Sequence, residues 1–305
     1  MVMFSKIASF AKEELGASVS SHKTDFEVTG VSALASWNDG FIAFCKDVDI
    51  AVLTKAKDRE CAALIIPIDA EVPGCPNIRT ENPRYCFAKI VAKFFVEKPA
   101  PGVHATAYVD PRSFVESTAT VGPYCTIGPN VAIGARTVLH NHVAVAQNVE
   151  IGEDCVLWSH CVIGEDGFGV EADKVGNLIR IPHIGGVKIG NRVHIGNFTS
   201  VVGGTLDPTV IEDGAMIDNL VHIAHNAWIG ENCQIIACAE ISGSVKIGRN
   251  AWIAPNASII QKVEIGENSI IGIGAAVTQS IPANVIAAGV PAKVIRNLQK
   301  AVKDE

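Results

Sequence analysis

Aliphatic residues recur every six positions along most of the chain. One uninterrupted series runs from Ile211 to Val277, and an earlier series runs from Val103 to Ile163. An amphipathic helix repeats its apolar positions about every 3.6 residues and a strand repeats them every second residue, so neither explains a strict period of six. A chain that winds in short strands does, because one side chain from each strand then enters a shared central column.

Three such hexads make one triangular coil of eighteen residues. A glycine often follows the aliphatic residue, as in Ile127-Gly128 and Ile247-Gly248, and we expect it to permit the bend between flat strands. The period therefore predicts a mainly β protein built as a parallel β-helix of about eight or nine coils. The series breaks at Gly164–Gly186 and at Val202–Val210. Interruptions of a solenoid form loops on one face, often the binding face, so both segments are candidates for site-forming loops.

Residues 1–98 lack the hexads and predict a separate small α/β domain. Apolar spacing favours a helix over 4–15, strands over 40–45 and 62–68, and a helix over 83–95 opened by Asn82-Pro83. Lys98-Pro99 begins a stiff linker. The predicted domains are therefore 1–98, an α/β domain; 99–285, the β-helix; and 286–305, a C-terminal cap and tail.

Composition narrows the classes of function. Hydrophobic residues make up 48% of the chain and charged residues 19%, which indicates a packed protein. The net charge of −7 argues against nucleic acid as a partner, and no window is apolar enough to span a membrane. The nine cysteines are scattered without a CxxC pair, which favours reduced thiols and a cytoplasmic location.

Three local strings add a family resemblance to the hexads. They are GEDGFG at 164–169, IPHIGG at 181–186 and IDNLVHIAHN at 217–226. Together they resemble the UDP-3-O-acylglucosamine N-acyltransferases of the lipid A pathway. The resemblance implies a left-handed β-helix, a uridine-binding N-terminal domain, a cytoplasmic homotrimer and no bound cofactor. It also implies a UDP-linked amino sugar as acceptor, with an acyl carrier protein or coenzyme A thioester as donor.

Acyl transfer to an amine needs a general base and a donor to the tetrahedral oxyanion. By the resemblance, His225 is the general base; without it, a surface histidine at a coil corner is the simpler interpretation. Gly243 lies eighteen residues later, one whole coil, so the two positions should stack. The resemblance gives the backbone N–H of Gly243 the role of oxyanion donor; the alternative is an ordinary bend glycine.

The remaining candidates are substrate-binding residues. Asp218 and Asn219 resemble a pair that lines the family's substrate cleft, although hydrogen bonding at a coil corner explains them equally well. Phe44 is a candidate to stack on uracil, with a core position as the alternative, and Phe168 is a candidate to cover the donor or the sugar. We expect no metal site, because His222 and His225 point to opposite faces of an extended segment.

Three features depart from the family pattern and keep a second donor open. Val202-Gly203-Gly204 replaces an Asp-Arg-Gly, Lys262 stands where the family has a second histidine, and the ending AAGVPAKVIR resembles that of short-chain sugar acetyltransferases. The alternatives are therefore a short-chain acyl-CoA-dependent N-acyltransferase acting on a nucleotide-linked amino-deoxysugar for surface polysaccharide, and a β-helix scaffold without catalysis.

Overall fold

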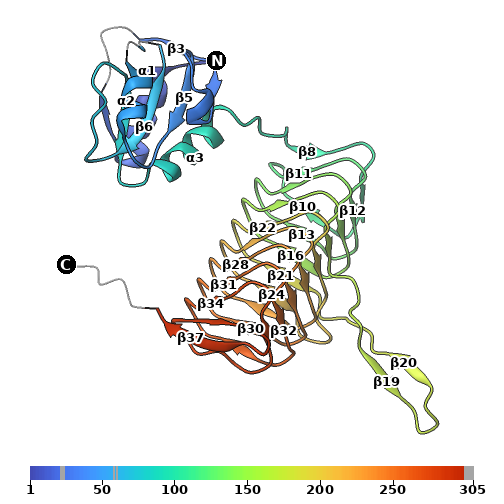
Figure 1. The fold of residues 1–305 in the computed structure, drawn as a ribbon. Coiled ribbons are helices and arrows are strands. Elements are labelled where there is room, and N and C mark those ends of the chain that lie inside the picture. Colours follow the sequence, from blue (N-terminus) through green and yellow to red (C-terminus); the bar gives the residue numbers. More distant parts are fainter. Residues whose placement is uncertain (21–24, 58, 60, 299–305) are drawn as a thin grey trace. The chain divides into compact units, whose positions relative to one another are not determined.

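The computed structural model describes residues 1–20, 25–57, 59 and 61–298. The chain divides into two compact units, Met1–Lys98 and Pro99–Glu305 (Figure 1). The first unit contains three α-helices, and the second is a stack of short strands wound into coils. The predicted fold class, a left-handed parallel β-helix with a small α/β domain, is confirmed.

The first unit is a five-stranded sheet with helices on both faces. Alternate residues of the central strand β6 separate its two cores: Ile65 packs with residues of α1 and α3, and Leu64 packs with residues of α2. Helix α3 begins where the Asn82 side chain accepts a hydrogen bond from the N–H of Tyr85. The elements are β1 (Val2–Met3), α1 (Phe4–Leu15), β2 (Ser18–Ser20), β3 (Glu27–Val28), β4 (Gly30–Val31), a 3-10 turn (Leu34–Ser36), β5 (Phe41–Phe44), α2 (Ile50–Ala56), β6 (Ala63–Pro67), β7 (Asn77–Thr80) and α3 (Pro83–Phe94).

The second unit has three flat faces, which the chain visits in a fixed order. The first face contains β8 (Gly102–Val103), β11 (Thr120–Val121), β14 (Val138–Leu139), β17 (Val156–Leu157), β22 (His194–Ile195), β25 (Met216–Ile217), β28 (Gln234–Ile235), β31 (Trp252–Ile253), β34 (Ile270–Ile271), β36 (Val285–Ala288) and β37 (Lys293–Asn297). The second face contains β9 (Tyr108–Val109), β12 (Thr126–Ile127), β15 (Ala144–Val145), β18 (Val162–Ile163), β23 (Ser200–Val201), β26 (His222–Ile223), β29 (Glu240–Ile241), β32 (Ser258–Ile259) and β35 (Ala276–Val277). The third face contains β10 (Phe114–Val115), β13 (Ala132–Ile133), β16 (Val149–Ile151), β21 (Val187–Ile189), β24 (Thr209–Ile211), β27 (Trp228–Ile229), β30 (Lys246–Ile247) and β33 (Glu264–Ile265).

The hexad positions form the core of the coiled unit. On the second face Ile223 pairs with Ile241, which pairs with Ile259, and all three side chains are fully buried. Backbone hydrogen bonds run from each coil to the next, as from the N–H of Ala224 to the carbonyl of Ile241 at 2.9 Å. Residues eighteen apart are therefore direct neighbours wherever no loop intervenes.

The bends occur at a different place from the predicted glycines. Gly128 and Gly134 do not have a positive φ. At Gly134 an added Cβ would lie 2.6 Å from the backbone of Gly152 in the next coil, so the missing side chain permits close stacking rather than the bend. The chain turns two residues later, where Asn130 and Arg136 take φ values of 57° and 58°.

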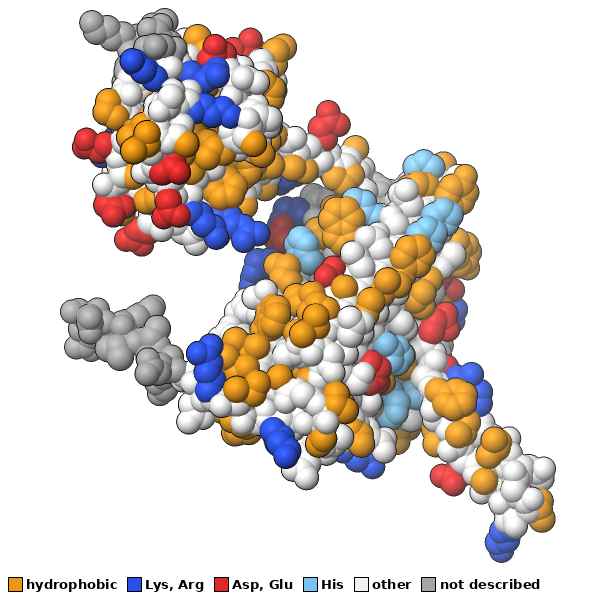
Figure 2. All heavy atoms as spheres, viewed as in Figure 1, with side chains coloured by type: hydrophobic (Ala, Val, Ile, Leu, Met, Phe, Trp, Pro, Cys, Tyr) orange, Lys and Arg blue, Asp and Glu red, His pale blue; other side chains and the backbone are white. Residues whose placement is uncertain are grey.

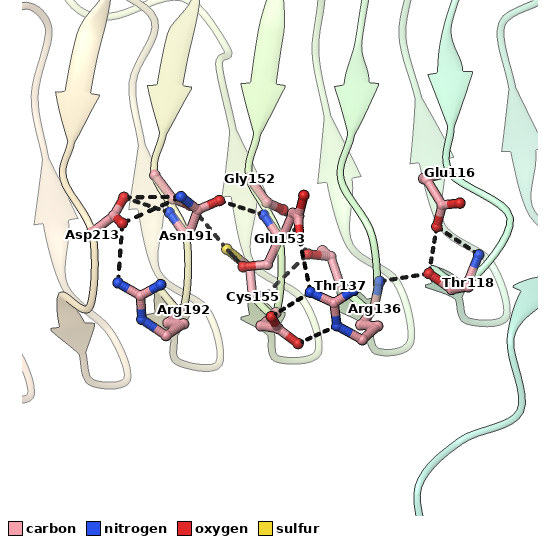
Figure 3. A network of polar contacts seen from close by, with 12 residues as sticks. Glu116, Thr118, Arg136, Thr137, Gly152, Glu153, Cys155, Asn191, Arg192 and Asp213 are labelled. Atoms are coloured by element: carbon pink, nitrogen blue, oxygen red, sulfur yellow. Dashed lines mark hydrogen bonds and ion pairs between the residues drawn. The ribbon is translucent and has the colours of Figure 1, made fainter.

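Polar side chains tie the coils together at the corner between the third and first faces (Figure 3). Arg136 spans one coil to Glu153 and Asp154, with N–O distances of 2.7 Å to each. Further along the same corner, the N–H of Asn191 donates to Asp213 at 2.8 Å, and this bond helps to lower the pKa of that carboxyl. Each of these exposed ion pairs contributes little to stability. The side chains also accept hydrogen bonds from backbone N–H groups that the bonds between coils do not use.

Aromatic rings stack along the corner between the first and second faces. Tyr124, His142, His160 and Phe198 occupy equivalent left-handed positions in successive coils, and their ring centroids lie 5.0, 4.7 and 4.9 Å apart. Histidine and hydrophobic side chains gather on the visible face of this unit (Figure 2). Ring stacking therefore links the coils at this corner, whereas charged side chains link them at the corner between the third and first faces.

Both interruptions of the hexads leave the stack at the remaining corner, between the second and third faces. The first was expected to be loop throughout, but it contains an antiparallel hairpin of β19 (Val170–Ala172) and β20 (Leu178–Arg180), which extends away from the coils (Figure 1). Among the described residues the two strands pair only with each other, so they add no periodic signal that would distinguish them from a loop. The two interruptions meet in a bridge between Gly186 and Gly204.

The C-terminal end of the stack is closed by an antiparallel strand pair. Strand β36 continues the first face in parallel, and β37 then turns back along it. The predicted cap over 286–305 falls partly on these strands, and its last residues, 299–305, lie outside the described residues.

Truncating a column residue should destabilise the coiled unit far more than truncating its outward neighbour. Ile247 is 1% exposed and Lys246 of the same strand is exposed. We expect Ile247→Ala to cost about 2–5 kcal/mol of unfolding free energy, because it leaves a cavity between two coils, and Lys246→Ala to cost less than about 0.5 kcal/mol. Urea denaturation followed by circular dichroism measures both. Equal losses would contradict the column.

Candidate active site

The candidate base lies at the corner from which both loops emerge. His225 follows strand β26 of the second face and precedes strand β27 of the third. The loops 164–186 and 202–208 leave the stack at this corner in the two preceding coils. The rigid coils and the two irregular segments therefore meet around His225.

The structure brings His225 and Gly243 into direct contact. The N–H of Ser244 donates to the carbonyl of His225 at 2.9 Å, which stacks the two corners one above the other. A Cβ added to Gly243 would lie 2.6 Å from Nε2 and 2.7 Å from Cε1 of the imidazole. The ring therefore covers the α-carbon of Gly243, and any side chain at position 243 would displace it.

The hydrogen bonds between coils do not use the backbone N–H of Gly243. Gly243 stands two residues after an inward aliphatic side chain. Pro123 and Pro255 stand at the equivalent place in other coils, and proline has no N–H, so the hydrogen bonds between coils need no N–H there. At Ala237 the equivalent N–H is taken by the carboxylate of Asp218 at 3.2 Å. Within the described part of the chain, the N–H of Gly243 donates to no acceptor.

Asn226 sets the orientation of the imidazole. Its Oδ1 lies 3.0 Å from Nδ1 of His225. The amide of Asn226 is itself fixed by the second loop, because Nδ2 donates to the carbonyl of Asp207 at 2.7 Å and Oδ1 accepts from the N–H of Thr205 at 3.2 Å. Since Oδ1 can only accept, Nδ1 of the neutral imidazole carries the proton and Nε2 keeps its lone pair, on the side of Gly243.

A second histidine, contributed by the first loop, also touches His225. His183 is 4% exposed, and its ring meets that of His225 edge-on at 5.4 Å between centroids. Neither Asn226 nor His183 was assigned a role from the sequence, although both lie in the strings that carry the resemblance. Only the immediate succession His225-Asn226 offered a signal; the approach of His183 depends on the path of a loop.

Asp218 and Asn219 lie at a different corner, before strand β26 rather than after it. The Asp218 carboxylate accepts from the N–H groups of Asn219 and Ala237, at 2.8 and 3.2 Å. Oδ1 of Asn219 accepts from the N–H of Asn197 at 2.7 Å. Both side chains thus tie neighbouring coils together, and within this chain the structure does not bring them to His225.

The two aromatic candidates lie in different environments. Phe44 is half-buried in the first unit, 4.9 Å from the ring of Phe87, and packs against the core between the sheet and its helices. Phe168 lies in the first loop and is 83% exposed. The glycines on both sides of Phe168 pack on His183, so this side chain projects from the edge of the site.

Of the two glycines in Val202-Gly203-Gly204 only Gly203 departs from the family's Asp-Arg-Gly, and both have a packing reason. Gly203 donates from its N–H to the carbonyl of Glu165 at 3.0 Å, and a Cβ at Gly204 would overlap the carbonyl of Asp207. An added Cβ at Gly203 would lie 3.0 Å from the carbonyl oxygen of Gly164, so the missing side chain lets the second loop lie against the backbone of the first. Lys262 is exposed one coil beyond the site, and its N–H donates to the carbonyl of Gly243 at 3.0 Å.

The buried cysteines of the coils are poor candidates for nucleophiles. Burial raises the pKa of the Cys161 thiol to about 12 and that of Cys233 to about 11, so both stay protonated near neutral pH. Among the described residues no three His, Cys, Asp or Glu side chains group as they would around a metal ion. In the same residues no helix has the length and hydropathy needed to cross a membrane.

Comparisons with known proteins agree with this fold. The family model of the bacterial transferase hexapeptide, a model of six repeats, matches residues 208–243 and 244–279. The UDP-3-O-acylglucosamine N-acyltransferase of Coxiella burnetii is 36% identical over 242 residues, 72% of this chain and 70% of its own. That of Delftia acidovorans is 50% identical over 143 residues, 47% of this chain and 42% of its own. The structure of the Francisella novicida UDP-N-acetylglucosamine acyltransferase superposes with a TM-score of 0.60 at 25% identity, covering 64% of this chain and 70% of that one.

The coils and these relatives define a hexapeptide-repeat acyltransferase. Within that class, the chain belongs to the UDP-3-O-acylglucosamine N-acyltransferase family. The alternative of a scaffold without catalysis is thereby set aside.

A methyl group at position 243 should disable the site without unfolding it. In Gly243→Ala the new Cβ would lie within 2.6 Å of Nε2 of His225 and push the imidazole aside, so we expect kcat to fall by about a hundredfold. The matched control is Ala237→Gly, which changes the equivalent place one corner earlier and should leave kcat near that of the wild type. Steady-state kinetics measure both, and an unchanged kcat in Gly243→Ala would contradict the contact.

Proposed function

We propose that the chain transfers an acyl group from a thioester donor to the amine of UDP-3-O-acylglucosamine, as in lipid A biosynthesis. The single observation that carries the proposal is the contact of the His225 imidazole with Gly243, whose N–H makes no hydrogen bond among the residues that the structure describes. The names of the relatives supply the acceptor, and the geometry supports the type of reaction.

The proposed mechanism uses two groups of this chain. Nε2 of His225 removes a proton from the attacking neutral amine as the amine nitrogen forms a bond to the thioester carbonyl carbon. The N–H of Gly243 donates to the oxygen as negative charge develops on it. When the tetrahedral intermediate collapses, the carbon–sulfur bond breaks and the imidazolium returns its proton to the leaving thiolate.

Asn226 supports both steps from the far side of the ring. Its Oδ1 accepts from Nδ1 and stabilises the imidazolium that forms when Nε2 takes the proton. Because two backbone groups of the second loop fix the Asn226 amide, the imidazole is held in its orientation before substrate arrives.

We propose a homotrimer in the cytoplasm as the working form, with the acyl donor carried either by an acyl carrier protein or by coenzyme A. Free thiols support a reducing compartment. Asp218, Asn219, Phe168 and Phe44 stay candidates for substrate contacts, the last for the uracil ring. Their packing in a single chain supports structural roles for Asp218, Asn219 and Phe44 as well.

Removing the imidazole should abolish turnover and leave the fold intact. We expect His225→Ala to lower kcat by about a hundredfold to ten-thousandfold, because the general base is lost. His222→Ala is the matched control, since His222 lies exposed on strand β26, just before His225, and this variant should retain full activity. Thiol release measures turnover, and Tm and sedimentation report the fold and the oligomer. Retained activity in His225→Ala would remove it from the base role.

The donor is decided by direct competition. The protein is incubated with UDP-3-O-acylglucosamine, or with other UDP-amino sugars, and with either 3-hydroxyacyl carrier protein or acetyl-coenzyme A. We expect thiol release with the carrier protein and the 3-O-acylated sugar. Release with acetyl-coenzyme A and an unacylated amino-deoxysugar would instead support the short-chain alternative, which Val202-Gly203-Gly204 and the ending AAGVPAKVIR favour.

A further inference from the structure

His183 is a buried imidazole to which the proposed mechanism gives no task. It comes from the first loop, just before the chain re-enters the stack, and only 4% of its surface is exposed. Its Nδ1 lies 2.9 Å from the carbonyl of Ile181, so in the neutral ring Nδ1 carries the proton and donates it. Its Nε2 is buried and has no hydrogen-bond partner among the residues that the structure describes.

The ring of His183 lies between the candidate base and the backbone of the first loop. On one side it meets the His225 ring at 5.4 Å between centroids, with the planes inclined by 65°. On the other side a Cβ added to Gly167 would lie 2.8 Å from Nε2 of His183, so only a glycine fits there. Arg180 donates to the carbonyl of Gly167 at 2.6 Å and holds that backbone down on the ring.

Filling space does not explain an imidazole at this place. A phenylalanine of similar size would occupy the same volume without leaving a buried nitrogen unpaired, which is unfavourable. What phenylalanine lacks is the donor that fixes the plane of the ring against the carbonyl of Ile181. The structure therefore tolerates an unpaired Nε2 because the same ring carries the donor that fixes its angle beside His225.

We propose that His183 is a positioning residue for the acyl-transfer base: its anchored ring holds the His225 imidazole in the plane that directs Nε2 toward Gly243. Asn226 fixes the hydrogen bond at Nδ1, but a single hydrogen bond leaves the ring free to tilt about it. Edge contact from His183 removes that freedom. The inference rests on the proposed function only for the base role of His225; the ring contact itself does not.

The kinetic test uses three substitutions that separate the ring from its anchor. Because a small displacement of a catalytic group is costly, we expect His183→Ala to lower kcat by about tenfold to a hundredfold with KM for both substrates within about twofold. His183→Phe restores the ring without its anchor to the carbonyl of Ile181 and should recover only part of kcat. His183→Asn keeps a donor for the carbonyl of Ile181 but has no ring, and should behave like His183→Ala.

A second readout needs no turnover. Nitrogen NMR of the histidine-labelled protein reports the tautomer of each ring, and comparison with His225→Ala assigns the His225 signals. We expect the Nδ1-protonated form of His225 in the wild type and a mixture of tautomers in His183→Ala, because a ring that is free to tilt loses its hydrogen bond to Asn226. The matched control is His160→Ala, which removes a ring stacked 4.7 Å from His142 at another corner and should change neither kcat nor the His225 signals.

The outcomes separate the two proposals. A loss in His183→Ala confined to KM, or a kcat within about twofold of the wild type with unchanged His225 signals, would overturn the positioning role. Full activity in His225→Ala would overturn the base role instead, while the tautomer measurement would still report whether His183 holds that ring.

Discussion

Every feature of the coiled unit depends on the hydrogen bonds between successive coils. They run from the N–H groups of one coil to the carbonyls of the next, over all three faces. Because each coil takes eighteen residues, these bonds place chemically unrelated residues in contact at a fixed separation along the chain. Four features follow from this constraint: the buried aliphatic columns, the stacked rings, the ion pairs between coils such as Arg136 with Asp154, and the contact of His225 with Gly243.

The three corners divide the work among themselves. One is tied by charged and amide side chains, and another by stacked rings and by Asp218 and Asn219. The remaining corner releases both loops, and there the irregular backbone supplies what the repeats lack: carbonyls that orient Asn226 and a second imidazole against the first. Rigid coils set the distance between base and N–H, and the loops set the angle of the base.

The sequence predicted those parts of the structure that follow from a period. The hexads specified the coils, their core and the stacking of His225 on Gly243, because side chains that fill a column must recur at fixed intervals. The hairpin of β19 and β20 escaped prediction, since two three-residue strands that pair only with each other leave no periodic signal. His183 escaped it for a related reason: forty-two residues separate it from His225, and the path of a loop brings them together. The sequence predicted the bend at the glycines, because glycine is common in turns. The chain in fact turns at the left-handed residue two positions after each glycine.

Since both loops leave the second face and return to the third, the chain re-enters the stack one hexad further round, whatever the length of the excursion. The loops can therefore have any length, whereas each coiled stretch between them must contain a whole number of hexads. Removing one hexad from such a stretch would rotate everything downstream by a third of a revolution and carry His225 to another edge of the prism. Removing three hexads would shorten the stack by one whole coil and leave every corner aligned with those of the other coils. New substrate contacts can thus arise by lengthening a loop, with no change in the coils that carry the catalytic pair.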